Sequence, residues 1–321
     1  MAARGLRIGL VVGGLLGGAG PAEAVSFAFS QIAGDTLSDA QGQAFAAAAA
    51  AWSAVISDPV VVNIGIGFRD LGTGVGGGAV LGATQPNFGT VTYAGFSNAV
   101  TADARSGADR AAVAALPATG PSARITLTTA EARALGFGAA AATDGSIEFS
   151  SNPRVVFATA RTDLASGRYD LIGTAAHEIG HLLGFQSALD TGSATRTALD
   201  VFRFAGLGAP GFTAGQAAYF SVDGGATSLG SFSVGGSGQY QASHWLQGTG
   251  GLMDPAVVDG VAKDITPLDV VALDAVGWDA VVAEPPSGAV LLAGLGLLGL
   301  WRGRPGWQGW LGWRGQPGEP A

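Results

Sequence analysis

The sequence of 321 residues contains no cysteine. Disulfide bridges, thiolate metal ligands and a cysteine nucleophile are therefore excluded, and so is an enzyme kept latent by a cysteine. Histidine is also scarce, because the chain has only His177, His181 and His244. Any site that needs several imidazole groups must draw on these three.

Positive charge is the second shortage. Lys263 is the only lysine, charged residues make up 12% of the chain, and the formal net charge is -8. Residues 25–282 are more acidic still, with eleven basic and twenty-one acidic side chains. This balance argues against binding to nucleic acid and to anionic membrane surfaces. The apolar fraction of 48% is enough for a sizeable core.

Residues 1–24 have the pattern of a secretory signal peptide. Arg4 and Arg7 precede an apolar stretch at 8–16, and Ala-Glu-Ala at 22–24 is a small-x-small cleavage site. An N-terminal anchor helix is the alternative, although the apolar stretch is short for a membrane span. We therefore expect the protein to leave the cytoplasm.

The other end of the chain, residues 283–321, has three successive parts. Glu-Pro-Pro at 284–286 is followed by an apolar run at 288–301 and then by Arg302 and Arg304. This order resembles the C-terminal sorting signal (PEP-CTERM type) of bacterial exosortase substrates. The match is partial, because the first proline of Pro-Glu-Pro is missing and the chain continues past the arginines. A plain membrane tail is the alternative.

The resemblance of the tail implies where the protein acts and what it meets. It implies a secreted or cell-surface protein, exported from a bacterial cytoplasm. It also implies transient membrane association through the tail and an exosortase-type sorting machinery as a partner.

Between these ends, residues 25–282 predict one α+β domain. Runs rich in Val, Ile and Phe indicate strands, and capped or alanine-rich stretches indicate helices. The expected strands are at 25–29, 59–68, 146–149, 154–159, 217–222 and 231–234. The expected helices are at 39–54, 97–116, 130–135, 170–184 and 266–276. Glycine-rich stretches at 71–81 and 224–238 are expected to be loops.

The segment His177-Glu178-Ile179-Gly180-His181 carries the strongest functional signal. Two residues four apart in a helix lie on one face, so both imidazoles can bind one metal ion. Glu178 then points beside the metal, where it can deprotonate a bound water. The predicted helix is apolar on nearly all sides and should be buried, where unpaired polar groups are costly. The segment therefore predicts a zinc site.

The third ligand decides the class of zinc enzyme. A class that takes a glutamate from a later helix is disfavoured, because the only later glutamates lie in the tail. Position 187, where a histidine would complete the pattern His-Glu-x-x-His-x-x-Gly-x-x-His, is serine. Two candidates remain: His244, whose imidazole suits zinc, and Asp190, three residues beyond the expected position.

A second segment carries a family resemblance. His244 is followed by Trp245 and, shortly after, by Gly-Leu-Met-Asp-Pro at 251–255. Together with the motif at 177–184, this arrangement resembles the leishmanolysin type of metzincin metallopeptidase, in which a large insertion separates the second and third histidines. The resemblance covers mainly residues 173–187 and 243–255. It implies a twisted mixed sheet, an active-site helix above the cleft and an irregular C-terminal subdomain with a Met-turn.

The resemblance also implies a role for each matching residue. The zinc ligands would be His177, His181 and His244. Glu178 would be the general base. Gly184 would allow the sharp turn after the second histidine, and Met253 would form an apolar floor beneath the metal without binding it.

One departure from the family concerns the residues after the methionine. Some metzincins have a tyrosine there that can swing to the metal, whereas this chain has Asp254 and Pro255. The group that stabilises the oxyanion is therefore open, and Tyr240 is a candidate.

The predicted function is an exported zinc-dependent endopeptidase that hydrolyses protein or peptide substrates by Glu-assisted attack of zinc-bound water. The alternative is a zinc-stabilised cell-surface or extracellular-matrix protein without peptidase activity, for which the sorting tail is the main clue. Glu178 favours the enzyme, because a structural zinc site would not need a carboxylate at that position.

Overall fold

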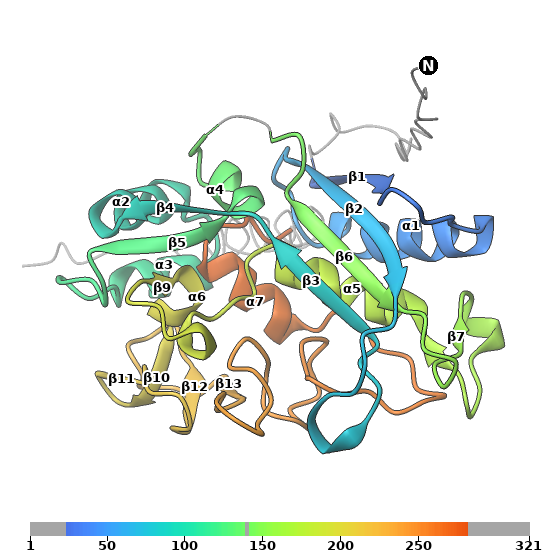
Figure 1. Cartoon of the computed structure of the whole chain (residues 1–321). Coiled ribbons are helices and arrows are strands. Elements are labelled where there is room, and N and C mark those ends of the chain that lie inside the picture. The colour runs from blue at the N-terminus through green and yellow to red at the C-terminus, as the bar shows by residue number, and fades with distance from the viewer. Residues whose placement is uncertain (1–23, 139–140, 282–321) are drawn as a thin grey trace, which may run out of the picture. The chain divides into compact units, whose positions relative to one another are not determined.

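The structure is a computed structural model that describes residues 24–138 and 141–281 (Figure 1). The predicted signal peptide, apart from its last residue, and the predicted sorting tail at 283–321 lie outside the described residues. The chain divides into two units, 1–281 and 282–321. Among the described residues, no helix has the length and apolar character needed to cross a bilayer.

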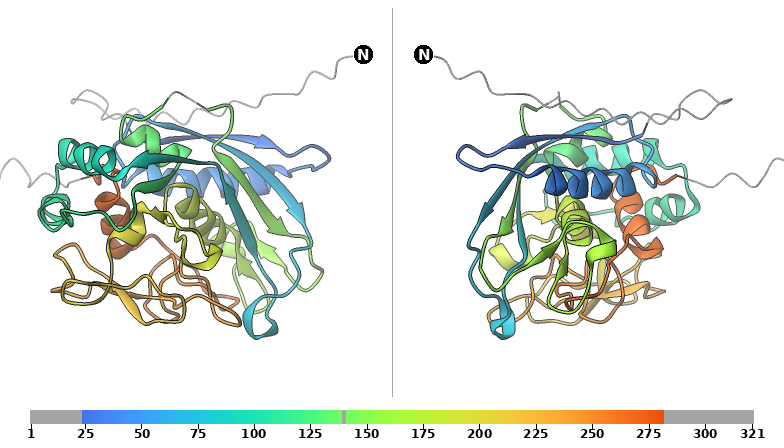
Figure 2. Two further views of the ribbon diagram at one scale, coloured as in Figure 1. Left: turned by 60° about the vertical axis from the view of Figure 1, so that its left-hand side comes forward. Right: turned by 90° about the vertical axis from the view of Figure 1, so that its right-hand side faces the viewer.

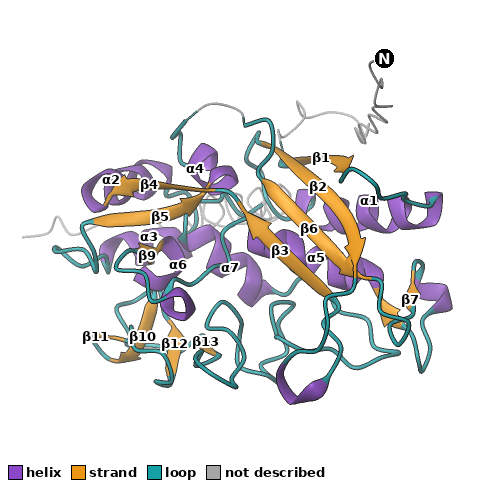
Figure 3. Ribbon diagram, viewed as in Figure 1, coloured by secondary structure: helices purple, strands orange, loops and turns teal. Residues whose placement is uncertain are grey.

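A four-stranded mixed sheet covers one face of the core (Figures 1 and 3). Its strand order is β1 (Ser26–Gln31), β2 (Val61–Arg69), β6 (Gly145–Ser150) and β3 (Gly82–Pro86). The first three strands are parallel, and β3 pairs antiparallel with β6 at the edge. In β2, Val62, Ile64 and Ile66 are buried at every second position, because one face of the sheet meets the core.

Two helices, α1 (Asp39–Ser53) and α5 (Leu171–Leu182), pack against each other on this face of the sheet (Figure 2). The helix α1 begins at Asp39, as predicted. Ser38 caps it, because Ser38 and Gln41 exchange the two hydrogen bonds of a capping box. At its other end, Trp52 Nε1 donates to the carbonyl of Ala176 in α5 at 2.8 Å. The sheet and α1 thus hold α5 on two sides.

A second, smaller sheet consists of β4 (Phe88–Thr92), β5 (Arg124–Thr128) and β9 (Arg196–Thr197). Helices surround it, and three of them contact its strands directly: α2 (Tyr93–Asp103), α4 (Thr129–Ala134) and α6 (Ala198–Val201). Two further helices pack together beside α2: α3 (Gly107–Ala114) and α7 (Pro267–Ala275).

The prediction of a single helix at 97–116 is wrong. The structure has two helices there, and the first begins earlier, at Tyr93. Ser106 starts the second helix: its hydroxyl accepts from Asp109 N at 2.9 Å, and the Asp109 carboxylate accepts from Ser106 N at 3.1 Å. A capping box of this kind satisfies free backbone N–H groups, so it begins a new helix where the alanine-rich composition alone indicates continuation.

The part of the domain after α6 has little regular structure (Figure 3). It holds a small antiparallel sheet of β10 (Arg203–Gly206), β11 (Ala209–Pro210), β12 (Ala218–Phe220) and β13 (Gly230–Phe232). Arg203 is 1% exposed and organises this region, because its guanidinium donates to three backbone carbonyls. These carbonyls belong to Gly211, Ser233 and Ala242. Loops then lead to α7.

Most predicted elements are confirmed with shifted ends. The exceptions are 97–116 and the strand expected at 154–159, of which only β7 (Phe157–Ala158) forms, paired with β8 (Tyr169–Asp170). The glycine-rich stretch 71–81 is largely a loop, as predicted. Three single-turn 3-10 helices complete the description: η1 (Val75–Gly77), η2 (Arg161–Asp163) and η3 (Leu189–Thr191). The predicted α+β class with a twisted mixed sheet is therefore confirmed.

Candidate metal centre

The helix α5 is mostly buried. Its N-terminus is capped by Asp170, whose carboxylate accepts a hydrogen bond from Ile172 N at 3.1 Å. Nine of its twelve residues are buried, including Glu178 and His181. The chain leaves the helix through Gly184, whose φ of 118° favours glycine. A buried polar side chain is costly unless it has a hydrogen-bond partner or a counter-charge. The contacts of Glu178 and His181 therefore indicate the chemistry of the site.

His177, His181 and His244 meet at one point, although the last two are 63 positions apart in the sequence. One ring nitrogen from each lies within 4.8 Å of the other two, and the Nε2 atoms of His181 and His244 are 3.2 Å apart. No other His, Cys, Asp or Glu group in residues 24–138 and 141–281 has this spacing. The predicted ligand set is therefore brought together by the fold.

Asp190, the alternative third ligand, is not part of this group. Its carboxylate accepts hydrogen bonds from Gly236 N at 3.1 Å and from Ala242 N at 2.6 Å. Asp190 thereby fixes the loop that leads into His244. The geometry favours His244 as the third ligand and assigns Asp190 a supporting position.

Each histidine turns its other ring nitrogen towards a backbone carbonyl. Nδ1 of His177, His181 and His244 lies 2.9, 2.7 and 3.3 Å from the carbonyl oxygens of Leu252, Phe185 and Gln241 respectively. A carbonyl only accepts, so each Nδ1 carries a proton, which leaves Nε2 as the nitrogen that can bind a metal. This is the arrangement that orients histidine ligands around metals in proteins.

The protonation of two of the rings, His181 and His244, supports the same interpretation. Burial lowers the pKa of His181 to about 3 and holds the pKa of His244 well below its usual value. Both rings are therefore neutral near pH 7. Neutral Nε2 lone pairs 3.2 Å apart repel each other unless a cation lies between them. The donor set thus fits a metal ion that prefers imidazole ligands, such as zinc.

Glu178 lies beside the histidines and is held by the edge strand β3. Its Oε2 accepts from Thr84 Oγ1 at 2.6 Å, and a β-carbon added at Gly82 would lie 2.5 Å from its Oε1. Burial raises the pKa of Glu178, while the nearby His177 and the Thr84 hydrogen bond act in the opposite direction. A buried carboxylate with a raised pKa next to a candidate metal centre is suited to accept and return a proton.

Met253 packs directly under the histidine-bearing helix. It is completely buried, and a β-carbon added at Gly180 would lie 2.6 Å from its sulfur. Its carbonyl accepts from Trp245 N at 3.0 Å, which joins the Met253 segment to the residue after His244. Met253 therefore contacts α5 at Gly180, which lies between the two histidines in the sequence, and its role as an apolar floor beneath a metal stays a prediction.

Sequence reasoning missed the residue that anchors this segment. Asp269 in α7 is fully buried, and its carboxylate accepts from Trp245 Nε1 at 2.8 Å, Leu252 N at 2.9 Å and Met253 N at 3.3 Å. The helix cap at Thr266 was predictable, and Asp269 stands at the third position of the same capping box. Its reach to the Met253 segment depends on tertiary packing.

Tyr240 lies in the loop before His244, where its carbonyl accepts from Gly235 N at 3.1 Å. Within the described part of the chain, no hydrogen bond links its hydroxyl to the three histidines. Its role in stabilising an oxyanion stays a prediction.

Comparison with known proteins leaves the family open: no protein family, no curated protein and no solved structure matches the chain. The assignment therefore depends on the geometry of the site.

Proposed function

We propose that the chain is a zinc-dependent endopeptidase of metzincin type. One observation carries the proposal: three imidazoles, each with its Nδ1 on a backbone carbonyl, bring ring nitrogens within 4.8 Å of one another, and the buried carboxylate of Glu178 lies on the helix that carries two of them. Three protein ligands leave a coordination position open, which is typical of catalytic and not of structural zinc. When bound there, zinc would polarise a carbonyl and make water more acidic.

The residues of the chain divide the remaining work. His177, His181 and His244 hold the metal, and backbone carbonyls hold the three rings. Glu178 takes the proton from the attacking water and passes it to the leaving amine. Thr84 keeps the Glu178 side chain in place through its 2.6 Å hydrogen bond. Met253, which is completely buried against α5, would form the apolar floor beneath the metal.

A peptide substrate is supported by the edge strand. The strand β3 has β6 on one side and is the last strand of its sheet, so its other edge can pair with an extended peptide. Two residues of β3, Gly82 and Thr84, contact Glu178. A peptide added along β3 would therefore run past the proposed base. We further propose that this peptidase is exported, on the strength of the sequence patterns at 1–24 and 283–321.

The test combines metal content with proteolysis. The full chain and the variants Glu178→Ala, His244→Ala and Glu148→Ala would be purified, their zinc content measured, and casein cleavage followed. Glu148 is a matched control, because it is a glutamate of β6 whose carboxylate forms an ion pair with Arg69 of β2. We expect zinc and cleavage in wild type and Glu148→Ala, zinc without cleavage in Glu178→Ala, and loss of both in His244→Ala.

Two results would contradict the proposal in different ways. Stoichiometric zinc with no cleavage of a broad panel of proteins would favour the zinc-stabilised surface protein. A wild-type chain without zinc, or one that prefers another metal, would overturn the ligand assignment or the identity of the ion.

A further inference from the structure

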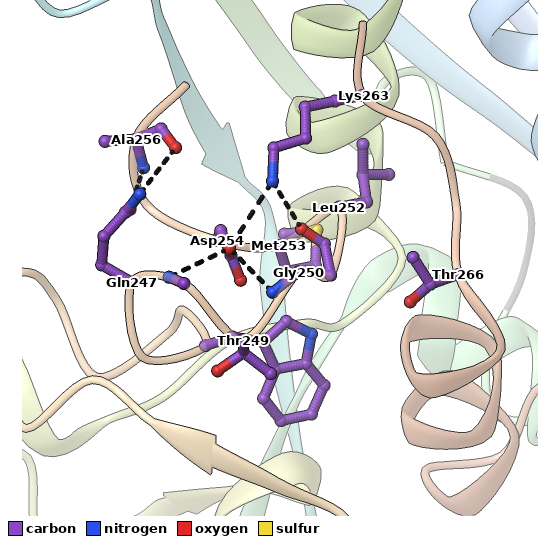
Figure 4. Close-up of polar contacts among 12 residues, drawn as sticks. Gln247, Thr249, Gly250, Leu252, Met253, Asp254, Ala256, Lys263 and Thr266 are labelled. Carbon is purple, nitrogen blue, oxygen red and sulfur yellow. Dashed lines mark hydrogen bonds and ion pairs between the residues drawn. The ribbon is translucent and has the colours of Figure 1, made fainter. Parts of the chain in front are cut away.

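The carboxylate of Asp254 is buried next to the Met253 segment and has one cation near it (Figure 4). The Asp254 side chain is 2% exposed, and its Oδ2 accepts from Gly250 N at 3.0 Å and from Gly248 N at 3.3 Å. Its Oδ1 is buried and has no hydrogen-bond partner among residues 24–138 and 141–281. The ammonium of Lys263 lies 3.5 Å from Oδ2. A buried carboxylate with an unsatisfied oxygen depends strongly on the charge that faces it.

Lys263 holds both ends of the short turn 251–254. Its Nζ donates to the carbonyl of Gly251 at 3.3 Å and faces Asp254 at the other end (Figure 4). Leu252 lies between these two points, and its carbonyl is the acceptor for Nδ1 of His177 at 2.9 Å. The ammonium therefore constrains the peptide group that sets the tautomer and orientation of one metal ligand.

The backbone of Lys263 forms hydrogen bonds near the start of α5, the helix that carries His177 and His181. Its N–H donates to the Asp170 carboxylate, the cap of α5, at 3.3 Å. Its carbonyl accepts from the guanidinium of Arg161 at 2.7 Å and lies 2.9 Å from the position of a β-carbon at Gly173. One residue thus connects the start of the helix that carries His177 with the turn that orients His177.

We propose that Lys263, paired with Asp254, is a positioning residue of the metal centre, which sets the orientation of His177 through the carbonyl of Leu252. This inference depends on the metal-binding part of the proposed function and not on peptidase activity. The chain contains no second lysine that could take over this contact.

The test measures metal binding and folding separately. Zinc dissociation constants would be obtained for the full chain by competition with a chromophoric chelator, at a temperature where circular dichroism shows every variant folded. Cobalt-loaded samples would be compared by visible absorption, which reports the ligand geometry. The variants are Lys263→Met, Lys263→Arg, Asp254→Asn with Lys263→Met, and the control Arg154→Met, which removes an exposed cation elsewhere.

We expect Lys263→Met to weaken zinc binding by about ten- to a hundred-fold and to change the cobalt spectrum, as loss of an outer contact to a metal ligand does. Lys263→Arg should restore most of the affinity, because it restores the cation. Asp254→Asn should also rescue Lys263→Met, because an amide oxygen can accept from Gly248 and Gly250 without needing a cation. Arg154→Met should bind zinc like wild type.

Other outcomes overturn the inference. An unchanged zinc affinity and cobalt spectrum in Lys263→Met would show that the lysine does not act on His177. A loss that neither Lys263→Arg nor Asp254→Asn repairs would indicate a general packing role. Failure of the proposed peptidase would look different, because wild type would then not cleave casein while the ratio of zinc affinities between wild type and Lys263→Met stayed large.

Discussion

Gly180 and Met253 are in direct contact, so that a β-carbon at Gly180 would lie 2.6 Å from the Met253 sulfur and 3.3 Å from Trp52 Cζ2. Met253 and Trp52 are both fully buried and have little room to move away. Glycine at this point of α5 lets the helix approach the Met253 segment closely. The close approach of Met253 to the helix that carries His177 and His181 thus requires a residue without a side chain at position 180.

This contact predicts opposite effects of one substitution in two helices. Gly42→Ala in α1 meets no atom within 4 Å and should stabilise the protein by about 0.5–1 kcal/mol, because alanine favours helix. Gly180→Ala should instead destabilise it by about 1–3 kcal/mol through overpacking, and should weaken zinc binding. Urea unfolding and zinc titration of both variants check this. Equal stabilisation by the two substitutions would mean that Met253 does not support α5.

The position of Glu178 gives a second prediction. A β-carbon at Gly82 would lie 2.5 Å from Glu178 Oε1, whereas one at Gly89 in β4 meets no atom within 4 Å. Gly82→Ala should displace the carboxylate and reduce kcat/KM by about a hundred-fold, with zinc content unchanged. Gly89→Ala should behave as wild type. A Gly82→Ala enzyme with full activity would argue against Glu178 as the base.

The residues of the proposed metal centre divide into a predictable and a less predictable part. His177 and His181 are four residues apart in one helix, so their spacing alone places them on one face, and Glu178 directly follows the first of them. His244 lies 63 positions after His181, beyond loops, short strands and the short helix α6, and its position depends on contacts such as those of Asp190. The sequence could therefore name two candidates for the third ligand, and only the fold distinguishes them.

The residues that contact Glu178 and the Met253 segment could not be predicted from the sequence, because their positions also depend on the fold. Thr84 and Gly82 lie next to Glu178 because β3 pairs antiparallel with β6. That pairing joins residues that are far apart in the chain. From the sequence, Asp269 is only the partner of Thr266 in a helix capping box. Tertiary packing brings its carboxylate to the Met253 segment. The break of the helix at Ser106 shows the reverse: a local capping signal overrides a favourable composition.

The difference between His244 and Asp190 is open to a direct measurement. His244→Ala removes a proposed ligand and should abolish the stabilisation by zinc, which at a hundred-fold excess over Kd is about 2.7 kcal/mol. Asp190→Asn keeps an oxygen acceptor for Ala242 N and should retain most of this stabilisation. Thermal unfolding with zinc and with a chelator gives both values. Greater loss in Asp190→Asn than in His244→Ala would exchange their roles.

A group of aspartates far along the chain from the histidine motif predicts how stability changes with pH. Burial raises the pKa of Asp103 to about 7, and the nearby carboxylates of Asp279 and Asp58 act in the same direction. A raised carboxyl pKa means that the folded state holds its proton more tightly than the unfolded state. This contribution to stability is complete below about pH 4 and is lost as the pH rises through about 7.

Asp103→Asn should therefore make the protein more stable at pH 8 and leave its stability at pH 4 nearly unchanged. The gain is on the order of 1 kcal/mol, since solvent near this partly exposed side chain screens its charge. Unfolding would be measured from pH 4 to 8 with a chelator present, so that metal release from the histidines does not contribute. Asp163→Asn, an exposed carboxylate outside this group, is the matched control. If both variants follow the wild-type pH profile, the proton of Asp103 is not held in the fold, and the arrangement of Asp58, Asp103 and Asp279 must differ from the one described.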